Sequence, residues 1–133
     1  MIIIAHMNLI DLKISVIMIT GGLPLDKAGK SVELLYPNGT QMCELKSLPD
    51  KRFHHTQSGL ITCGGSWTKD TCLIFHEDGW KWHGSTLKPR YYHSSFKYKD
   101  TTLLIGGHDD NTTEILEKDG TQRMSFQLLH PTV

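Results

Sequence analysis

Histidines are the residues of this sequence best suited to chemistry, because a neutral imidazole can bind metals or transfer protons near neutral pH. The 133-residue sequence contains eight of them. His54-His55, His83 and His93 are candidates for one cluster, and His108-Asp109-Asp110 adds carboxylates. However, His55 and His93 each end an Arg-x-x-His motif, and the two motifs lie 38 residues apart. This repetition favours a structural role, such as hydrogen bonding between strands, so we expect no metal site and no cofactor.

The three cysteines, Cys43, Cys63 and Cys72, are the next candidates. Cys63 and Cys72 flank one loop between strands that we expect to be neighbours, where the cross-strand spacing is close to what a disulfide requires. They form a candidate disulfide, and the alternative is a pair of small buried thiols. Cys43 is left over, either buried or paired outside this chain. No Cys-x-x-Cys supports a zinc ribbon or a redox dithiol, and no serine stands in a Gly-x-Ser-x-Gly elbow.

Two triplets match the glycosylation sequon, Asn38-Gly39-Thr40 and Asn111-Thr112-Thr113. We expect both asparagines, Asn38 and Asn111, in loops or turns, where a glycan could be accepted. Such triplets also arise by chance, and Asn38-Gly39 already suits a tight turn. Together with the candidate disulfide, the sequons favour an extracellular location over a cytoplasmic one.

An internal repeat organises the elements that carry these residues. Apolar runs end in Gly-Gly three times, with intervals of 43 and 42 residues between the first glycines. Turn pairs recur at intervals of 40 and 41 residues, and the Arg-x-x-His motif occurs twice. The repeated residues are Gly21-Gly22, Gly64-Gly65 and Gly106-Gly107, the turn pairs Asn38-Gly39, Asp78-Gly79 and Asp119-Gly120, and the motifs Arg52/His55 and Arg90/His93.

Each repeat predicts four strands. A short apolar run before Gly-Gly suits a buried strand, and an alternating segment follows at residues 32–36, 72–75 and 113–116. The Asn-Gly or Asp-Gly pair then indicates a hairpin, and another strand follows. No long window has a helical period. We therefore predict an all-β fold in a single domain, residues 1–133, with approximate units 1–52, 53–90 and 91–133.

Four strands per unit of about 40–50 residues are typical of a propeller blade. With Gly-Gly, Arg-x-x-His and a downstream Trp, the unit resembles the kelch repeat, whereas the Trp-Asp pair of the rival propeller type is absent. Ser31-Val32-Glu33, Cys43-x-Leu45 and Asn111-Thr112-Thr113-Glu114 further resemble kelch-like proteins common in invertebrates. The resemblance implies a partial kelch-type β-propeller of about three four-stranded antiparallel blades.

The kelch resemblance also assigns roles to side chains. Arginines in the positions of Arg52 and Arg90 often lie near one mouth of the channel, where they can contact a partner's carboxylates. The alternative is an arginine that packs its stem and bonds loop carbonyls. Trp67, in the loop after Gly64-Gly65, is expected to be exposed and is a candidate interface anchor. Trp80 and Trp82 should face one side and pack between blades.

Three blades do not close a ring, because propellers typically have about 4–8 blades. We therefore expect the open ends of the three-blade array to pair with further blades or with another copy of the chain. The first unit has no clear Arg-x-x-His, and no third copy of that motif follows Arg90. The sequence leaves open whether the chain is part of a longer propeller or closes by association with another chain.

The functional prediction is a non-catalytic module that binds a protein or a glycan through propeller loops. Its alternative is a metal-dependent oxidase-like or glycan-processing enzyme on the same scaffold, since copper oxidases share it and Tyr91-Tyr92-His93 is similar to part of their ligand set. Lys plus Arg equals Asp plus Glu at 14 each, which argues against a nucleic-acid partner. The apolar stretch Met1–Ala5 is far shorter than the roughly 20 residues of a membrane span.

Overall fold

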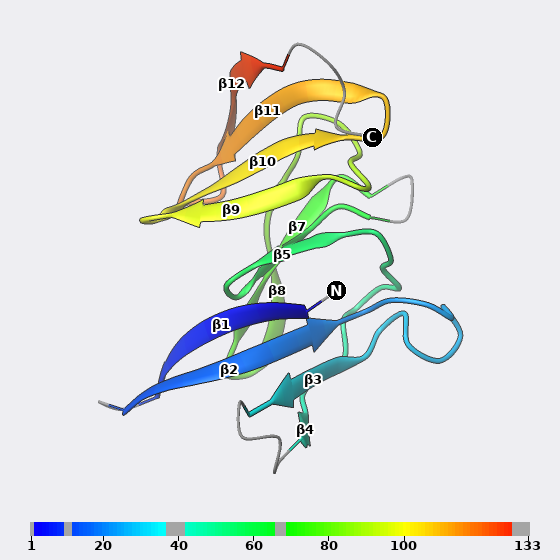
Figure 1. Ribbon diagram of the computed structural model, residues 1–133, viewed down its shortest axis with the longest axis vertical. Helices are drawn as coiled ribbons and strands as arrows, with labels where there is room; N and C mark the ends of the chain where they lie inside the picture. Colours follow the sequence, from blue (N-terminus) through cyan, green and yellow to red (C-terminus); the bar gives the residue numbers. More distant parts are fainter. Residues whose placement is uncertain (1, 10–11, 37–41, 66–68, 129–133) are drawn as a thin grey trace.

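The described strands of the chain form three antiparallel sheets of four strands each (Figure 1). The computed structural model describes residues 2–9, 12–36, 42–65 and 69–128. We call the sheets blades 1, 2 and 3 in chain order. Blade 1 contains β1 (Ile2–Leu9), β2 (Leu12–Thr20), β3 (Val32–Leu35) and β4 (Met42–Glu44). Blade 2 contains β5 (Thr56–Ser58), β6 (Ile61–Cys63), β7 (Thr71–His76) and β8 (Gly79–Ser85). Blade 3 contains β9 (Ser94–Tyr98), β10 (Thr101–Gly107), β11 (Asp110–Leu116) and β12 (Gln122–Gln127).

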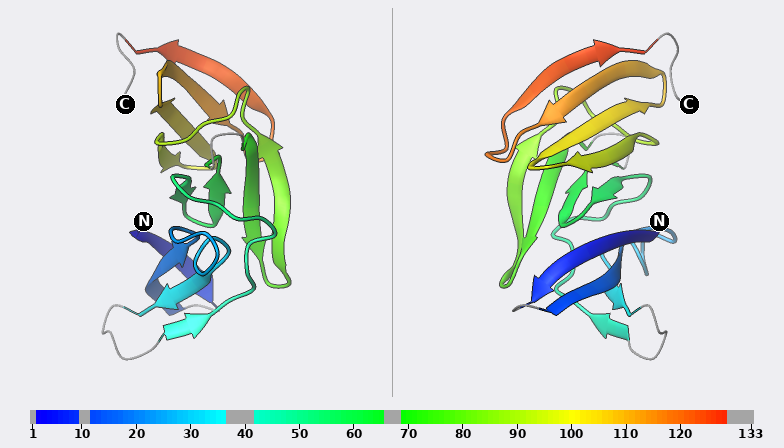
Figure 2. Two further views of the ribbon diagram at one scale, coloured as in Figure 1. Left: turned by 90° about the vertical axis from the view of Figure 1, so that its right-hand side faces the viewer. Right: turned by 60° about the vertical axis from the view of Figure 1, so that its left-hand side comes forward.

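Strand order within each blade follows the chain, so every blade is a meander of hairpins. The first strands of the blades meet, because β5 contacts both β1 and β9. The three sheets are stacked from blade 1 at one end to blade 3 at the other (Figure 2). The predicted all-β class and the three four-stranded antiparallel blades are confirmed, and no helix able to cross a membrane occurs among the described residues.

The alternating segments predicted from the sequence form the third strand of each blade, β3, β7 and β11. Between β7 and β8 the turn consists of Glu77 and Asp78, and Gly79 opens β8 with a φ of +125°. The positive φ explains why glycine follows Asp78, since other residues adopt this conformation only with strain. Asn38-Gly39 lies outside the described residues.

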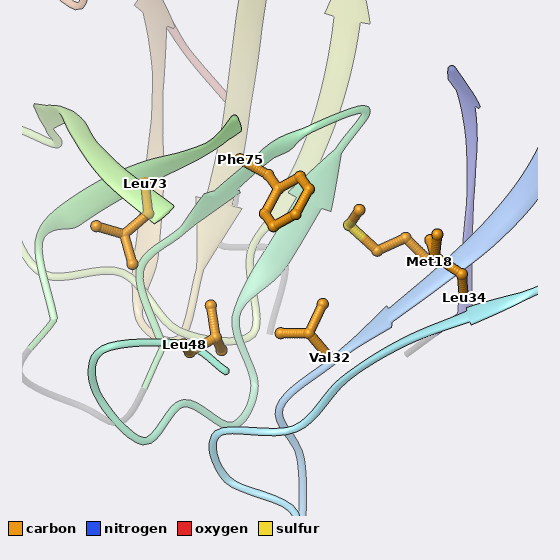
Figure 3. Close-up of a cluster of buried hydrophobic side chains, with 6 residues drawn as sticks. All are labelled: Met18, Val32, Leu34, Leu48, Leu73 and Phe75. Carbon is orange, nitrogen blue, oxygen red and sulfur yellow. The ribbon is translucent and has the colours of Figure 1, made fainter. Parts of the chain in front are cut away.

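The first hydrophobic cluster fills the junction between blades 1 and 2 (Figure 3). Met18 on β2 and Val32 and Leu34 on β3 face Leu73 and Phe75 on β7. Met18 is 0% exposed and Val32 is 2% exposed, so these side chains are fully removed from water. Apolar burial of this kind is the main favourable contribution to packing one sheet on another.

The second cluster fills the junction between blades 2 and 3. Cys63 and Cys72 are joined by a disulfide and pack with Leu104 on β10 and Leu116 on β11. All four side chains are at most 1% exposed. The two junctions are built alike, because one face of a blade packs against the opposite face of the next blade.

The two tryptophans of β8 have different surroundings. Trp80 packs against the first cluster, and its indole Nε1 donates to the carbonyl of Lys46 at 2.9 Å. Trp82 pairs with Leu73 across the strands and is 67% exposed. The prediction that both pack between blades therefore holds for Trp80 and is wrong for Trp82.

Candidate binding face at the blade junctions

The Gly-Gly repeat marks the places where neighbouring blades come closest. A Cβ on Gly21 would lie 2.5 Å from the carbonyl oxygen of Arg52 and 2.8 Å from Cε1 of His55. A Cβ on Gly64 would meet the same pair of groups in the next motif, the Arg90 carbonyl and the His93 ring. Because no side chain fits there, glycine is required at both positions.

The second glycine of each pair ties the backbones together. Gly22 N donates to the Arg52 carbonyl at 2.8 Å, and Gly65 N donates to the Arg90 carbonyl at 2.7 Å. The third pair, Gly106 and Gly107, ends β10 and also has positive φ angles, +63° and +140°. Each Arg-x-x-His motif is thus hydrogen-bonded to the Gly-Gly of the preceding blade.

Both arginines of the motif are buried, Arg52 at 0% and Arg90 at 2% exposure. Arg52 Nη1 donates to the carbonyls of Gly64 at 3.0 Å and Thr71 at 2.8 Å. Its Nε donates to Asp50 Oδ1 at 2.8 Å. These contacts match the alternative stated above, in which the arginine bonds loop carbonyls. We therefore do not include Arg52 or Arg90 in the binding face.

Arg90 has a second, more acidic set of partners. Its Nε donates to Glu114 Oε1 at 2.7 Å, and its Nη1 donates to Asp110 Oδ2 at 2.8 Å. Burial alone would raise the pKa of Asp110, but hydrogen bonds from Thr112 and the Lys88 ammonium hold it below its usual range. Asp110 therefore remains charged beside the guanidinium, and together with the Glu114 contact it compensates the burial of Arg90.

The motif histidines are buried and neutral. Thr20 Oγ1 donates to Gln57 Oε1 at 2.6 Å, so it accepts from His55 Nε2 at 2.9 Å and the His55 proton resides on Nε2. Thr56 Oγ1 and His93 Nε2 lie 2.7 Å apart. Burial and the nearby Arg52 charge lower the pKa of His55 to about 4. Burial and the Arg90 charge lower the pKa of His93 to about 3.

An open pocket of about 420 Å³ lies where β2 ends and β5 and β9 begin. Its volume falls in the range of about 300–1,000 Å³ typical of ligand sites. Aromatic, histidine and small side chains from all three blades form its walls. The lining residues are Thr20, Gly22, Leu23, Phe53, His54, His55, Tyr92 and His93.

A row of rings runs along this face, which we call the aromatic row: Phe53, His54, Tyr92, Tyr91 and His108. His54 stacks on Tyr92 with centroids 3.9 Å apart, and Tyr91 stacks on His108 with centroids 5.1 Å apart. Tyr92 is 43% exposed, so the row presents a ring to solvent.

The backbone is strained where it holds this row. His54 and Tyr92 have φ angles of +52° and +54°, a left-handed conformation that is costly for residues other than glycine. Tyr92 N donates to the His54 carbonyl at 3.0 Å, which ties the two strained residues to each other. Sequence reasoning missed the aromatic row, although the two variable positions of both Arg-x-x-His motifs are Phe53-His54 and Tyr91-Tyr92.

Three imidazole nitrogens around the pocket, Nδ1 of His54, His55 and His93, have no hydrogen-bond partner among the described residues. Neutral imidazole is a metal ligand, so this donor set invites a metal interpretation. However, in the described part of the chain no group of three His, Cys, Asp or Glu side chains is arranged to hold a metal ion. The three Nδ1 atoms are also buried, so they do not face a ligand in the pocket.

The remaining candidates are distributed away from the pocket. Asn111 is the second residue of β11, half-buried, and its Nδ2 donates to the Leu128 carbonyl at 3.1 Å. The prediction of a loop position for Asn111 is wrong, because β11 begins one residue before it. The side chains of Asn38, Cys43 and Trp67 lie outside the described residues, so the predictions for them stay predictions.

Comparison with known proteins supports the fold class but assigns no family. No protein-family model and no curated protein matches the chain. Among solved structures 73 chains match, including a fungal alcohol oxidase of the AA5 family in complex with copper, at a TM-score of 0.62 and 16% sequence identity. The match covers 90% of this chain and 29% of the oxidase chain, so this chain spans less than a third of that protein. At this identity the likeness shows the fold alone, and the chain has a partial propeller-like, all-β fold.

Proposed function

We propose that this chain is a non-catalytic, kelch-type binding module that takes a protein or glycan ligand at the pocket and the aromatic row. The observation that carries the proposal is the stacked pair His54 and Tyr92, held in strained left-handed backbone at the edge of a 420 Å³ pocket. Strain of this kind concentrates at functional sites. Exposed aromatic rings beside an apolar pocket are typical anchors for peptides and sugars.

Chemical features of the pocket narrow the ligand. Leu23 and Phe53 offer apolar contact, and the partly exposed ring of Tyr92 offers a flat surface. A ligand with an apolar or flat surface would match both. No charged side chain lines the pocket among the described residues, so strong ion pairing does not contribute to recognition there. The Cys63–Cys72 disulfide supports a role in an oxidising compartment outside the cell.

The test is a selection followed by one matched pair of variants. A random dodecamer peptide library and a glycan array are screened against the purified 133-residue chain. Tyr92→Ala, in the aromatic row, is expected to weaken any selected ligand at least tenfold. Tyr98→Ala removes a tyrosine that is 61% exposed on β9 and does not line the pocket, and should leave affinity unchanged. Equal behaviour of the two variants, or no selected ligand at all, would refute the proposal.

A second candidate, a metal-dependent oxidase-like enzyme, is favoured by the fold likeness to the copper-bound alcohol oxidase. Tyr92 and His93 would supply its ligands in the pocket. The discriminating measurement is a copper titration of the chain followed by electron paramagnetic resonance. Nitrogen hyperfine coupling that disappears in His93→Gln would favour the enzyme, whereas a spectrum of unbound copper would favour the binding module.

A further inference from the structure

The binding face presents apolar surface in two places, and the pocket is the first. Leu23 and Tyr92 both line it, and they are 60% and 43% exposed. Phe53 is buried and contributes to the same wall. The pocket therefore offers an aliphatic side chain and aromatic rings to one compact apolar group of a ligand.

The polar side chains of the pocket offer little to a ligand. Thr20 Oγ1 is bonded to both His55 and Gln57, and His93 Nε2 is bonded to Thr56. The Nδ1 atoms of the pocket histidines are buried. A ligand N–H that enters the pocket would lose its water without gaining one of these partners, which is unfavourable.

The second apolar surface is the far end of the aromatic row. The Tyr92 and Tyr91 centroids lie 5.7 Å apart, and the Tyr91 and His108 centroids lie 5.1 Å apart. His108 N donates to the Tyr91 carbonyl at 3.0 Å, which holds the β10–β11 turn against the row. The ends of β2 and β10 lie on the same side of the molecule (Figure 1). Because His108 is 44% exposed, the row presents a second ring two steps from the pocket.

A carboxylate extends the row at this end. The Asp109 side chain is 85% exposed, and its Oδ2 lies 3.0 Å from His108 Nδ1. The adjacent Asp110 is already paired with Arg90 and Lys88. Among the described residues Asp109 has no lysine or arginine partner of its own, so a ligand cation can pair with it.

A polyproline II segment matches this arrangement. It has three residues per turn and a rise of about 3.1 Å per residue, so positions i and i+3 lie about 9 Å apart on one side. Two ring steps separate Tyr92 from His108, which suits contacts at that spacing. Proline also has no N–H to lose water in the pocket, and aromatic-lined surfaces are the usual docking sites of such segments.

We propose that the pocket and the aromatic row bind a proline-rich segment of a partner protein in polyproline II conformation, with a basic residue beside it that pairs with Asp109. One proline ring fills the pocket against Leu23 and Tyr92, and another packs at Tyr91 and His108. This inference rests on the proposed binding function and narrows its ligand to one class of peptide.

The probe is a fluorescein-labelled peptide of six prolines with an arginine at each end. Fluorescence anisotropy measures its binding to the purified 133-residue chain. Replacing the six prolines by alanine removes the rings and restores the N–H groups, and should weaken binding about tenfold. Replacing the two arginines by glutamine should weaken it about threefold, as expected for a solvent-exposed ion pair.

Asp109→Asn tests the acidic end of the row. It should weaken the arginine peptide about threefold and leave the glutamine peptide unaffected. Asp100→Asn is the matched control, because Asp100 is an exposed aspartate in the β9–β10 turn, at the opposite end of β9 from the row. It should bind both peptides like the unaltered chain. In that chain, the amide resonances of Leu23 and Tyr92 should shift on addition of the proline peptide.

Three results would overturn the inference: equal binding of the proline and alanine peptides, unshifted Leu23 and Tyr92 amides, or equal effects of Asp109→Asn and Asp100→Asn. A glycan or a proline-free peptide whose affinity falls in Tyr92→Ala, together with no binding of the proline peptide, would overturn this inference alone and leave the proposed binding function in place. If no ligand of any kind depends on Tyr92, both fail.

Discussion

The two blade junctions share a backbone design but differ in what fills them. At the junction of blades 1 and 2, Met18, Leu34 and Phe75 form an apolar core, and Arg52 bonds an Asp50 carboxylate that is 31% exposed. At the junction of blades 2 and 3, the apolar contribution is smaller. There Arg90 bonds two carboxylates, of which Glu114 is fully buried.

One pair of equivalent positions shows the difference most directly. Leu73 in blade 2 pairs with Thr62, and Glu114 in blade 3 pairs with Leu104 in the same register. Leu73 contributes to an apolar cluster, whereas Glu114 holds Arg90. The repeated motif thus fixes where the backbones meet, and the residue facing the arginine decides whether the junction depends on apolar burial or on a buried ion network.

The largest expected difference between the two junctions is in the free energy of unfolding lost when the carboxylate beside each arginine is removed. Glu114→Ala leaves Arg90 short of one partner in a fully buried site, and breaking a buried ion pair costs about 3–5 kcal/mol. Asp50→Ala removes a partly exposed carboxylate at the other junction, where a solvent-screened pair contributes about 1 kcal/mol or less. Urea unfolding followed by tryptophan fluorescence measures both free energies. Equal losses would show that the junctions do not differ in the way that the burial of the two carboxylates implies.

The disulfide gives a smaller difference of the same kind. Cys63 and Cys72 are nine residues apart, and releasing a loop this short should lower the free energy of unfolding by about 2–3 kcal/mol. The double variant Cys63→Ala/Cys72→Ala should therefore unfold at lower urea concentration, and the reduced unaltered chain should match it. An unaltered chain with the same midpoint before and after reduction would show that the cross-link adds nothing to the second junction.

Sequence reasoning succeeded where backbone contact dictates residue type. Gly21 and Gly64 cannot carry a Cβ at the blade contacts, so their interval revealed the blades directly. The Cys63–Cys72 pairing followed in the same way, because adjacent strands place the two residues opposite each other. Such features depend on local register, which a repeat makes visible.

The candidate sites were less predictable because their partners do not recur at fixed offsets. The carboxylate that accepts the hydrogen bond from the arginine Nε lies two residues before Arg52 in one case and 24 residues after Arg90 in the other. No motif encodes both arrangements, so the burial of the two arginines became clear only in the folded chain. The aromatic row likewise depends on rings of different blades meeting, as His54 and Tyr92 do.

The smallest expected difference between the junctions is in their response to acid. His55 and His93 are neutral in the folded chain, with pKa values lowered to about 4 and about 3, whereas an unfolded histidine titrates near 6.5. Because the unfolded chain binds more protons than the folded chain below pH 6.5, the contribution of the two neutral histidines to stability is complete only above that pH. It falls as the pH drops towards the folded pKa, by about 1 kcal/mol per pH unit for each ring.

His55→Gln and His93→Gln should each flatten the decline in unfolding free energy measured between about pH 7 and about pH 4.5. Both junctions respond alike in this window, because both rings stay neutral in the folded state. They should separate only between about pH 4 and about pH 3, where His55 is largely protonated and His93, with the lower pKa, is still largely neutral. A decline that neither variant flattens would show that the acid sensitivity comes from other groups. Candidates are Asp50, whose pKa is lowered chiefly by the hydrogen bond from Arg52, and Asp110, whose pKa is lowered chiefly by the hydrogen bonds from Thr112.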